Sequence, residues 1–247
     1  MHELTAYFVS TGRRHAAAAL ESLNAQSLER DVVVVRDVCP MHRAYATTLD
    51  CPTEFCLVLD DDVILEPGVV PPLVEEFRRR RAEDPRVYML AALTHCEAKD
   101  RPGPGGFKLF HAPSLARVGW PDSPHVMHVQ LERAARLGLL RVQSGVHVGV
   151  QKVGSDLDLY KKYLWMAVRA RAGQLRAAPL SELLDLARRT HERRWWIACL
   201  GTLDARDVDA VGSKDERFVG ALARGVRVDE AGVDELARLV TAHLPRT

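Results

Sequence analysis

The sequence has few cysteines and no CxxC spacing. Five cysteines occur among 247 residues, at positions 39, 51, 56, 96 and 199. An odd number without a paired spacing argues against a disulfide framework and against a zinc knuckle. We therefore expect reduced thiols that are mostly buried, because a free cysteine behaves as a small hydrophobic side chain.

Long apolar runs and an excess of one charge are also missing. The chain has 34 Lys and Arg against 33 Asp and Glu, for a net charge of +1. This balance, without a stripe of basic and aromatic residues, disfavours a nucleic-acid-binding protein. No window approaches the roughly 20 apolar residues that a transmembrane helix needs, and the apolar stretch at residues 6–9 is too short for a signal peptide. We expect a cytoplasmic protein.

What is present is an alternation of apolar runs and helical spacings. Strands are predicted at residues 4–9, 31–35, 54–59 and 86–93, and helices at 14–25, 43–49 and 67–81. The unbroken apolar runs, including the four valines of residues 31–35, are typical of strands covered on both faces. The order predicts an α/β fold with a mainly parallel, Rossmann-like sheet flanked by helices.

The second half of the chain changes in character. Residues 97–106, rich in Pro and Gly, predict a loop. It could be mobile and bring Lys99 and Arg101 to an anionic ligand, and the alternative is a static surface loop remote from any ligand. A strand at 107–110, a helix at 129–137 and a strand at 141–150 follow, and from Asp156 onward the pattern is helical, with one helix over 181–201. We therefore predict an α/β domain over residues 1–153 and a C-terminal helical extension over 154–247.

A basic and aromatic segment in the extension allows two interpretations. Four arginines precede or adjoin a tryptophan pair: Arg188, Arg189, Arg193, Arg194, Trp195 and Trp196. They could make a peripheral contact with an anionic membrane surface, but core packing or a subunit contact is the favoured interpretation of paired tryptophans. The oligomeric state stays open.

Three carboxylates at the end of a predicted strand are the most informative feature. Asp60, Asp61 and Asp62 directly follow the apolar run of residues 55–59. Because side chains alternate along an extended chain, Asp60 and Asp62 should point to one side and Asp61 to the other. Two carboxylates so spaced can hold Mg²⁺ or Mn²⁺ beside phosphate oxygens, and the carboxyl ends of strands are where open α/β sheets bind ligands. The alternative is a polar strand end with a turn.

Residues 4–68, and more loosely residues up to 150, resemble nucleotide-sugar glycosyltransferases of the GT-A fold, particularly family 2. The landmarks occur in the family's order: the polar turn STG at residues 10–12, SLNAQSL with Gln26, VVVVRD ending at Asp37, and LDDD followed by Pro67. LFHAPSLARVGW, at residues 109–120, resembles the family's acceptor-side segment. The resemblance implies inverting transfer of a sugar from a nucleotide diphosphate donor to a hydroxyl acceptor, with Mn²⁺ or Mg²⁺.

The resemblance also implies roles for individual residues. Asp60 and Asp62 match the DxD pair, with Asp62 the direct metal ligand and Asp60 nearer the ribose or the metal. His147 resembles a late histidine that completes the metal or diphosphate site, and the alternative is a structural histidine of the strand. The expected nucleotide-binding residues are Ser10, Thr11, Arg13, Asp37, Asp60 and Asp61, with Asp37 accepting a hydrogen bond from the base.

One departure from the family concerns catalysis. Family 2 enzymes carry a Glu-Asp pair before a helix, and its Asp is the general base; here Leu131, Arg133 and Gly138 match that helix, but the acidic pair is missing. His128, His125 and Asp122 are the candidates for the base. The same departure favours, as an alternative, a nucleotide-sugar-binding protein without turnover.

A second enzyme class shares part of the acidic motif. In haloacid-dehalogenase-like phosphatases Asp60 would attack phosphorus and Asp62 would act as acid and base, with Ile64 in the usual Thr or Val position. That motif normally lies on the first strand, whereas two strand-helix units precede it here. Gly154, Asp156 and Asp158 imitate only part of the expected downstream series. This class is therefore the less favoured alternative.

Overall fold

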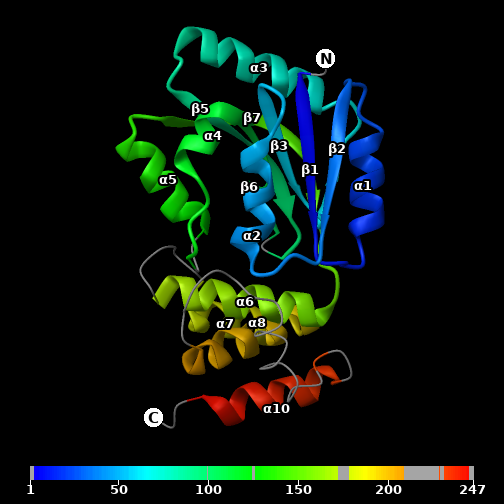
Figure 1. Cartoon of the computed structure of the whole chain (residues 1–247). Coiled ribbons are helices and arrows are strands. Elements are labelled where there is room, and N and C mark those ends of the chain that lie inside the picture. Colours follow the sequence, from blue (N-terminus) through cyan, green and yellow to red (C-terminus); the bar gives the residue numbers. More distant parts are fainter. Residues whose placement is uncertain are drawn as a thin grey trace. The chain divides into compact units, whose positions relative to one another are not determined.

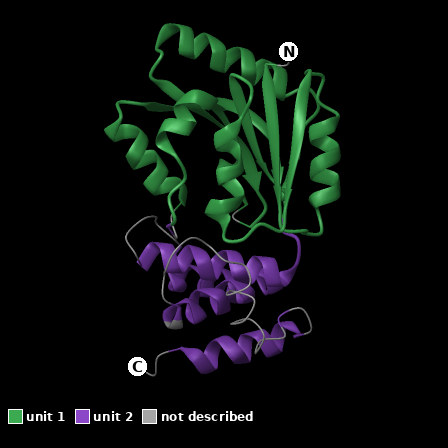
Figure 2. Cartoon of the chain, in the orientation of Figure 1, with its two compact units in different colours: residues 1–122, 126–152 green, residues 123–125, 153–247 purple. Residues whose placement is uncertain are grey.

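The computed structural model describes residues 3–98, 100–123, 126–171, 178–208, 228 and 231–244. Two compact units make up the chain, one formed by residues 1–122 and 126–152 and the other by residues 123–125 and 153–247 (Figure 2). The first unit contains a sheet with helices, and the described part of the second is helical. Lys99 and His125, both singled out from the sequence, lie outside the described residues.

The first unit is built on a seven-stranded sheet with the order β2-β1-β3-β6-β5-β7-β4 (Figure 1). The strands are β1 (Leu4–Ser10), β2 (Arg30–Arg36), β3 (Phe55–Asp60), β4 (Val63–Leu65), β5 (Val87–Cys96), β6 (Arg101–His111) and β7 (Leu140–Gln151). β1 is parallel to β2 and β3, and β5 is parallel to β7. β6 is antiparallel to β3 and β5, and β4 to β7. The sheet is mainly parallel, as predicted, with two reversed strands that the sequence did not indicate.

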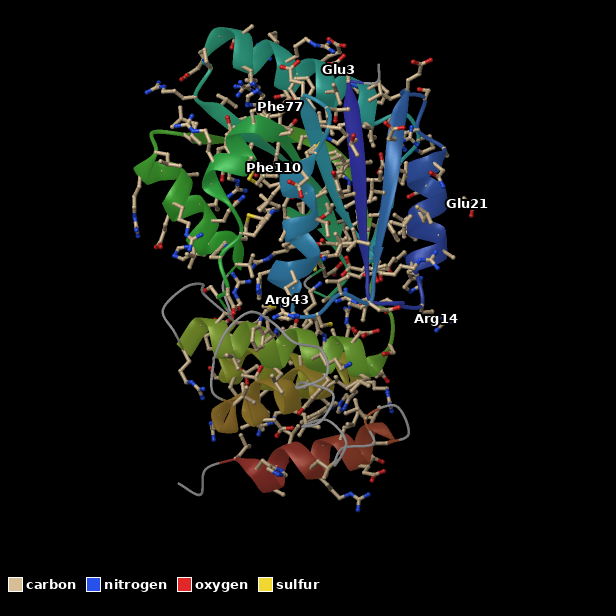
Figure 3. The ribbon with its side chains drawn as sticks, viewed as in Figure 1. Glu3, Arg14, Glu21, Arg43, Phe77 and Phe110 are labelled. Atoms are coloured by element: carbon tan, nitrogen blue, oxygen red, sulfur yellow. The ribbon has the colours of Figure 1, made fainter. Side chains whose placement is uncertain are left out.

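Helices cover both faces of this sheet because side chains alternate along its buried strands. α1 (Ala16–Asn24) and α3 (Val70–Glu83) contribute to the core beneath one face. α2 (Met41–Ala46), α4 (Ala112–Val118) and α5 (Val126–Arg136) contribute to the core on the other, and a 3-10 helix, η1 (Thr47–Asp50), follows α2. Phe77 and Phe110, labelled in Figure 3, belong to these two separate cores.

The valine run of β2 is less buried than predicted. β2 is the edge strand and pairs only with β1, and Val33 and Val34 are 40% and 39% exposed. The expectation of a strand covered on both faces is therefore wrong for β2. Apolar composition alone did not distinguish an edge strand from a central one.

The Pro/Gly-rich segment is mostly strand, so the prediction of a loop over residues 97–106 is wrong. β6 begins at Arg101 and pairs with β5 at Pro102 and Pro104, while its pairing with β3 begins only at Phe107. Residues 101–106 therefore have a neighbouring strand on one side only. Proline is tolerated there because its missing N–H is not needed on the open side.

The second unit contains α6 (Asp156–Arg171), α7 (Leu180–Thr190), α8 (Arg193–Asp204), a 3-10 helix η2 (Ala205–Asp207) and α10 (Val233–His243). The single helix predicted over 181–201 is wrong, because His191 adopts a left-handed conformation, with φ of 53°, and ends α7. Trp195 and Trp196 are buried on α8, which favours core packing. Among the described residues, no helix is long and apolar enough to cross a membrane.

The pairing of β4 with β7 depends on a close backbone approach at Gly149. A Cβ atom at this position would lie 2.0 Å from the carbonyl oxygen of Ile64, and Gly149 has φ of +145°. We expect Gly149→Ala to lower the free energy of unfolding by about 3 kcal/mol, because it adds a clash and backbone strain. Urea unfolding measures this.

The matched control is Gly145→Ala on the same strand, where an added Cβ meets nothing within 4 Å. We expect this variant to change the free energy of unfolding by less than about 0.5 kcal/mol. Equal stability of the two variants would contradict the close approach at Gly149.

Candidate functional site

The carboxyl ends of three parallel strands meet at one edge of the sheet. Ser10 at the end of β1 is in register with Arg36 on β2, and Val9 with Asp60 on β3. Beyond the strand ends, the N–H of Asp37 donates to the carbonyl of Ser10 at 2.9 Å, and the N–H of Asp61 donates to the carbonyl of Val9 at 3.1 Å. The predicted nucleotide-binding residues and the three acids are therefore neighbours.

Asp61 holds the turn between β1 and α1. One of its carboxylate oxygens accepts hydrogen bonds from the hydroxyl of Ser10 at 2.9 Å, the N–H of Thr11 at 2.9 Å and the N–H of Arg13 at 3.4 Å. Its side chain is 4% exposed. A buried carboxylate needs donors to compensate for its lost hydration. The bonds of Asp61 therefore stabilise the turn that forms part of the site.

Asp62 is bound from two other parts of the chain. Its Oδ2 lies 2.8 Å from Nη1 of Arg13 and accepts a bond from the amide of Gln151 at 3.2 Å. The N–H of Lys152 donates to the Asp62 carbonyl at 2.6 Å. β7 therefore fixes the backbone of the acidic turn, because Gln151 is also the residue paired with Val63 of β4.

Asp60 has a third set of partners. The hydroxyl of Tyr45 donates to its Oδ1 at 3.0 Å, and Nζ of Lys108 lies 3.6 Å from its Oδ2. Lys108 also lies over the Tyr45 ring, 5.8 Å from its centroid. Burial, and then the charge of Asp60, raises the pKa of Tyr45 well above its ordinary value. Tyr45 therefore remains a hydrogen-bond donor to Asp60 at physiological pH.

The β5–β6 hairpin lies directly against the acidic turn. Gly106, with φ of +67°, would place an added Cβ 2.2 Å from a Val63 methyl and 3.7 Å from Asp60 Cβ. Nζ of Lys152 is 2.5 Å from Oε1 of Glu97 at the hairpin's turn. The glycines predicted to make a mobile loop instead allow a close approach of strand to site.

Asp37 lies at this edge and His147 does not join it. Asp37 is exposed and left-handed, with φ of 56°, where it follows β2. His147 on β7 lies 3.5 Å from Glu66, and it is Gln151, four residues later, that reaches Asp62. Among the described residues no group of three His, Cys, Asp or Glu could hold a metal ion. The structure thus does not bring His147 to Asp60 and Asp62.

The candidates for a catalytic base are dispersed. His128 on α5 pairs with Glu132 at 3.2 Å, one helical turn along. Oδ1 of Asp122 lies 3.1 Å from Nδ1 of His42 on α2. Asp122 is thus connected to the helix that carries Tyr45, whereas the ion pair of His128 stays within its own helix.

The sequence pattern did not predict four residues that the structure places at the site. Tyr45, Lys108 and Gln151 bind the acids from α2, β6 and β7, and His42 pairs with Asp122. None belongs to a local motif. The cost of leaving adjacent carboxylates without counter-charges is a signal that partners exist, but it does not say which residues they are.

No protein-family model matches the sequence, and no curated protein matches it either. Among solved structures, the fold is similar to mannosyltransferase PcManGT from Pyrobaculum calidifontis, determined in complex with GDP-Man and Mn²⁺. The TM-score is 0.51 at 13% identity, covering 98% of this chain and 84% of that one. TarS 1-349 from S. aureus gives a TM-score of 0.46 at 13% identity, covering 98% and 91%. At such identities the likeness concerns the fold alone, and the GT-A glycosyltransferase fold that the sequence resembles is confirmed as the fold of this chain.

Proposed function

We propose that the protein is a metal-dependent glycosyltransferase that moves a sugar from a nucleotide diphosphate to a hydroxyl acceptor. The observation that carries this proposal is the set of three acids that end and follow β3, at the edge of the sheet where the carboxyl ends of β1, β2 and β3 meet, on a GT-A fold. In open α/β sheets this edge is where nucleotides bind. The neighbour with GDP-Man and Mn²⁺ supports the same ligand class.

The donor set suits Mn²⁺ or Mg²⁺ that arrives with a diphosphate. Such hard cations are commonly held by one or two carboxylates together with phosphate oxygens. Asp60 and Asp62 would supply the carboxylates, with Asp62 the direct ligand. When bound, the ion would neutralise negative charge on the departing diphosphate.

The remaining roles fall to groups around that pair. Asp37 would accept a hydrogen bond from the base, and Ser10 and Thr11 would line the nucleotide site on the turn that Asp61 holds. Tyr45 and Lys108 would keep Asp60 in place.

For the acceptor proton we favour Asp122 together with His42 over His128. The 3.1 Å contact orients the His42 ring, and histidine is the side chain that enzymes use most often as a general base. His42 also lies one helical turn before Tyr45 on α2. Sugar transfer with inversion would require such a base on the acceptor side.

A panel of nucleoside diphosphates and nucleotide sugars tests the proposal directly. A bound ligand raises apparent stability, by about 2.7 kcal/mol at roughly 100 times Kd. We expect stabilisation by one nucleotide in the presence of Mn²⁺ and slow hydrolysis of the corresponding sugar donor. Binding without hydrolysis or transfer under any acceptor would instead support the non-catalytic alternative.

Asp62→Asn should weaken Mn²⁺-dependent nucleotide binding by about tenfold or more, because an amide keeps the shape and removes the charge that holds the cation. Isothermal titration with and without Mn²⁺ measures this. Glu21→Gln, which removes the same charge from the outer side of α1 (Figure 3), should bind like wild type. Unchanged Mn²⁺-dependent affinity in folded Asp62→Asn would remove the metal assignment.

Asp37→Asn should weaken nucleotide binding about tenfold both with and without Mn²⁺, because it replaces a charged acceptor at the base by a weaker, neutral amide oxygen and does not change a metal ligand. Asparagine is chosen because it tolerates the left-handed backbone at this position. Asp50→Asn, at an exposed residue of η1, is the control for the same chemical change. If only the Mn²⁺-dependent part of the nucleotide affinity were lost, the assignment of Asp37 to the base would be wrong.

Asp61→Ala should lower the free energy of unfolding by about 2–4 kcal/mol, because it leaves the buried hydroxyl of Ser10 and the part-buried N–H of Thr11 without their acceptor. Urea unfolding measures the change, with Asp50→Ala as the exposed control. Wild-type stability in Asp61→Ala would show that the β1–α1 turn does not depend on this carboxylate.

A further inference from the structure

Arg13 bridges two of the three acids. Its Nη1 lies 2.8 Å from Oδ2 of Asp62, and its Nε lies 3.7 Å from Oδ1 of Asp61. The Arg13 side chain is 24% exposed, against 10% for Asp62 and 4% for Asp61. A partly exposed guanidinium therefore covers two nearly buried carboxylates.

Lys108, a second cation that lies beside the acids among the described residues, is held differently. Lys108 lies 3.6 Å from Asp60, is 11% exposed, and is placed by the pairing of β6 with β3 and by the Tyr45 ring. Arg13 comes from the turn between β1 and α1, outside regular secondary structure. Its backbone is tied to Asp61, while its long side chain can change position without disturbing a strand. Of Arg13 and Lys108, Arg13 is the one suited to exchange its partner.

Arg13 and a divalent cation would compete for the same carboxylate. Asp62 is the proposed direct metal ligand, and the Arg13 guanidinium already neutralises its charge at hydrogen-bond distance. A guanidinium group can also donate two parallel hydrogen bonds to phosphate oxygens. The donors that now contact Asp62 could therefore bind phosphate instead. A metal–diphosphate complex therefore offers both a replacement cation to Asp62 and new acceptors to Arg13.

We propose that Arg13 is the counter-ion of Asp62 in the donor-free protein and passes to the donor's diphosphate when the metal binds Asp62. This inference rests on the proposed function. Its consequence is that the cation and the diphosphate bind cooperatively: the ion alone must displace Arg13, whereas the complex gives Arg13 a new partner. Such coupling is reciprocal, so each ligand strengthens the other by the same factor.

We expect Arg13→Gln to change the affinities for the two ligands in opposite directions. Mn²⁺ alone should bind about tenfold more tightly, corresponding to ~1.4 kcal/mol, because its competitor is gone. A nucleoside diphosphate should bind about tenfold more weakly in the presence of Mn²⁺, because a phosphate partner is lost. The coupling between the two ligands should fall accordingly.

The control is Arg14→Gln, which removes the same charge from the next residue. Arg14 is exposed, and Figure 3 shows it pointing away from the sheet. Long-range electrostatic effects on the site are therefore closely matched. Arg14→Gln should retain wild-type affinities and coupling.

Isothermal titration of wild type, Arg13→Gln and Arg14→Gln with Mn²⁺ alone, nucleoside diphosphate in EDTA, and diphosphate with saturating Mn²⁺ tests the inference. Unchanged or weaker binding of Mn²⁺ alone by Arg13→Gln would overturn it. Coupling between Mn²⁺ and diphosphate that is as strong in Arg13→Gln as in wild type would also overturn it. In that case the proposed function would still stand, because wild type would bind the two ligands cooperatively. If wild type binds no nucleoside diphosphate with Mn²⁺, the proposed function fails and the inference fails with it.

Arg13→Lys covers the case in which Arg13→Gln does not fold. Lysine keeps the charge beside Asp62 but lacks the paired donors of guanidinium. Mn²⁺ alone should bind as in wild type, and the diphosphate should bind several-fold more weakly with Mn²⁺. Diphosphate binding equal to wild type would overturn the transfer of Arg13 to phosphate.

Discussion

The carboxylate of Asp61 is the constraint on which the site depends. It connects the end of β3 to the β1–α1 turn across about fifty residues of sequence, through the Ser10 hydroxyl and the N–H groups of Thr11 and Arg13. Because those donors are satisfied, the turn is held against the strand end. The side chain of Arg13 then starts from a fixed point beside Asp62. Asp61 thus determines where the groups proposed to bind ligand lie, whether or not it touches a ligand itself.

Three adjacent acids are tolerated because they do not share one environment. Asp61 accepts from the Ser10 hydroxyl and from backbone N–H groups and shares Arg13 with Asp62, Asp62 also accepts from Gln151, and Asp60 contacts Tyr45 and Lys108. Each carboxylate therefore has its own compensation for the repulsion of its neighbours. Burial of Tyr45 contributes to this division, because the raised pKa of its phenol maintains a neutral donor to Asp60. The acidic turn is already neutralised to a large extent before any metal arrives.

Sequence predicted the parts of the site that follow from local pattern. An apolar run followed by Asp60, Asp61 and Asp62 indicated a buried strand with acids at its carboxyl end, which the structure has. The sequence pattern did not predict Lys108 and Gln151 as partners of the acids. β6 and β7 reach the acidic turn by pairing with β3 and β4, which lie far from them in the sequence. The misreading of residues 101–106 has the same origin. Proline and glycine indicate a loop when the neighbouring strands are unknown. Here they occupy a strand segment that has a neighbouring strand on one side only.

The same distinction explains why the proposed donor side is better defined than the proposed acceptor side. The acids, Asp37 and the β1–α1 turn follow β1, β2 and β3, whose shared direction brings their ends together. The acceptor-side candidates Asp122 and His128 follow no parallel strand end, and their partners are His42 on α2 and Glu132 on the same helix. Parallel pairing thus converts sequence order into spatial proximity for the donor side. On the acceptor side, His42 was identified only by its contact with Asp122, and its pairing is a product of tertiary packing rather than of motif.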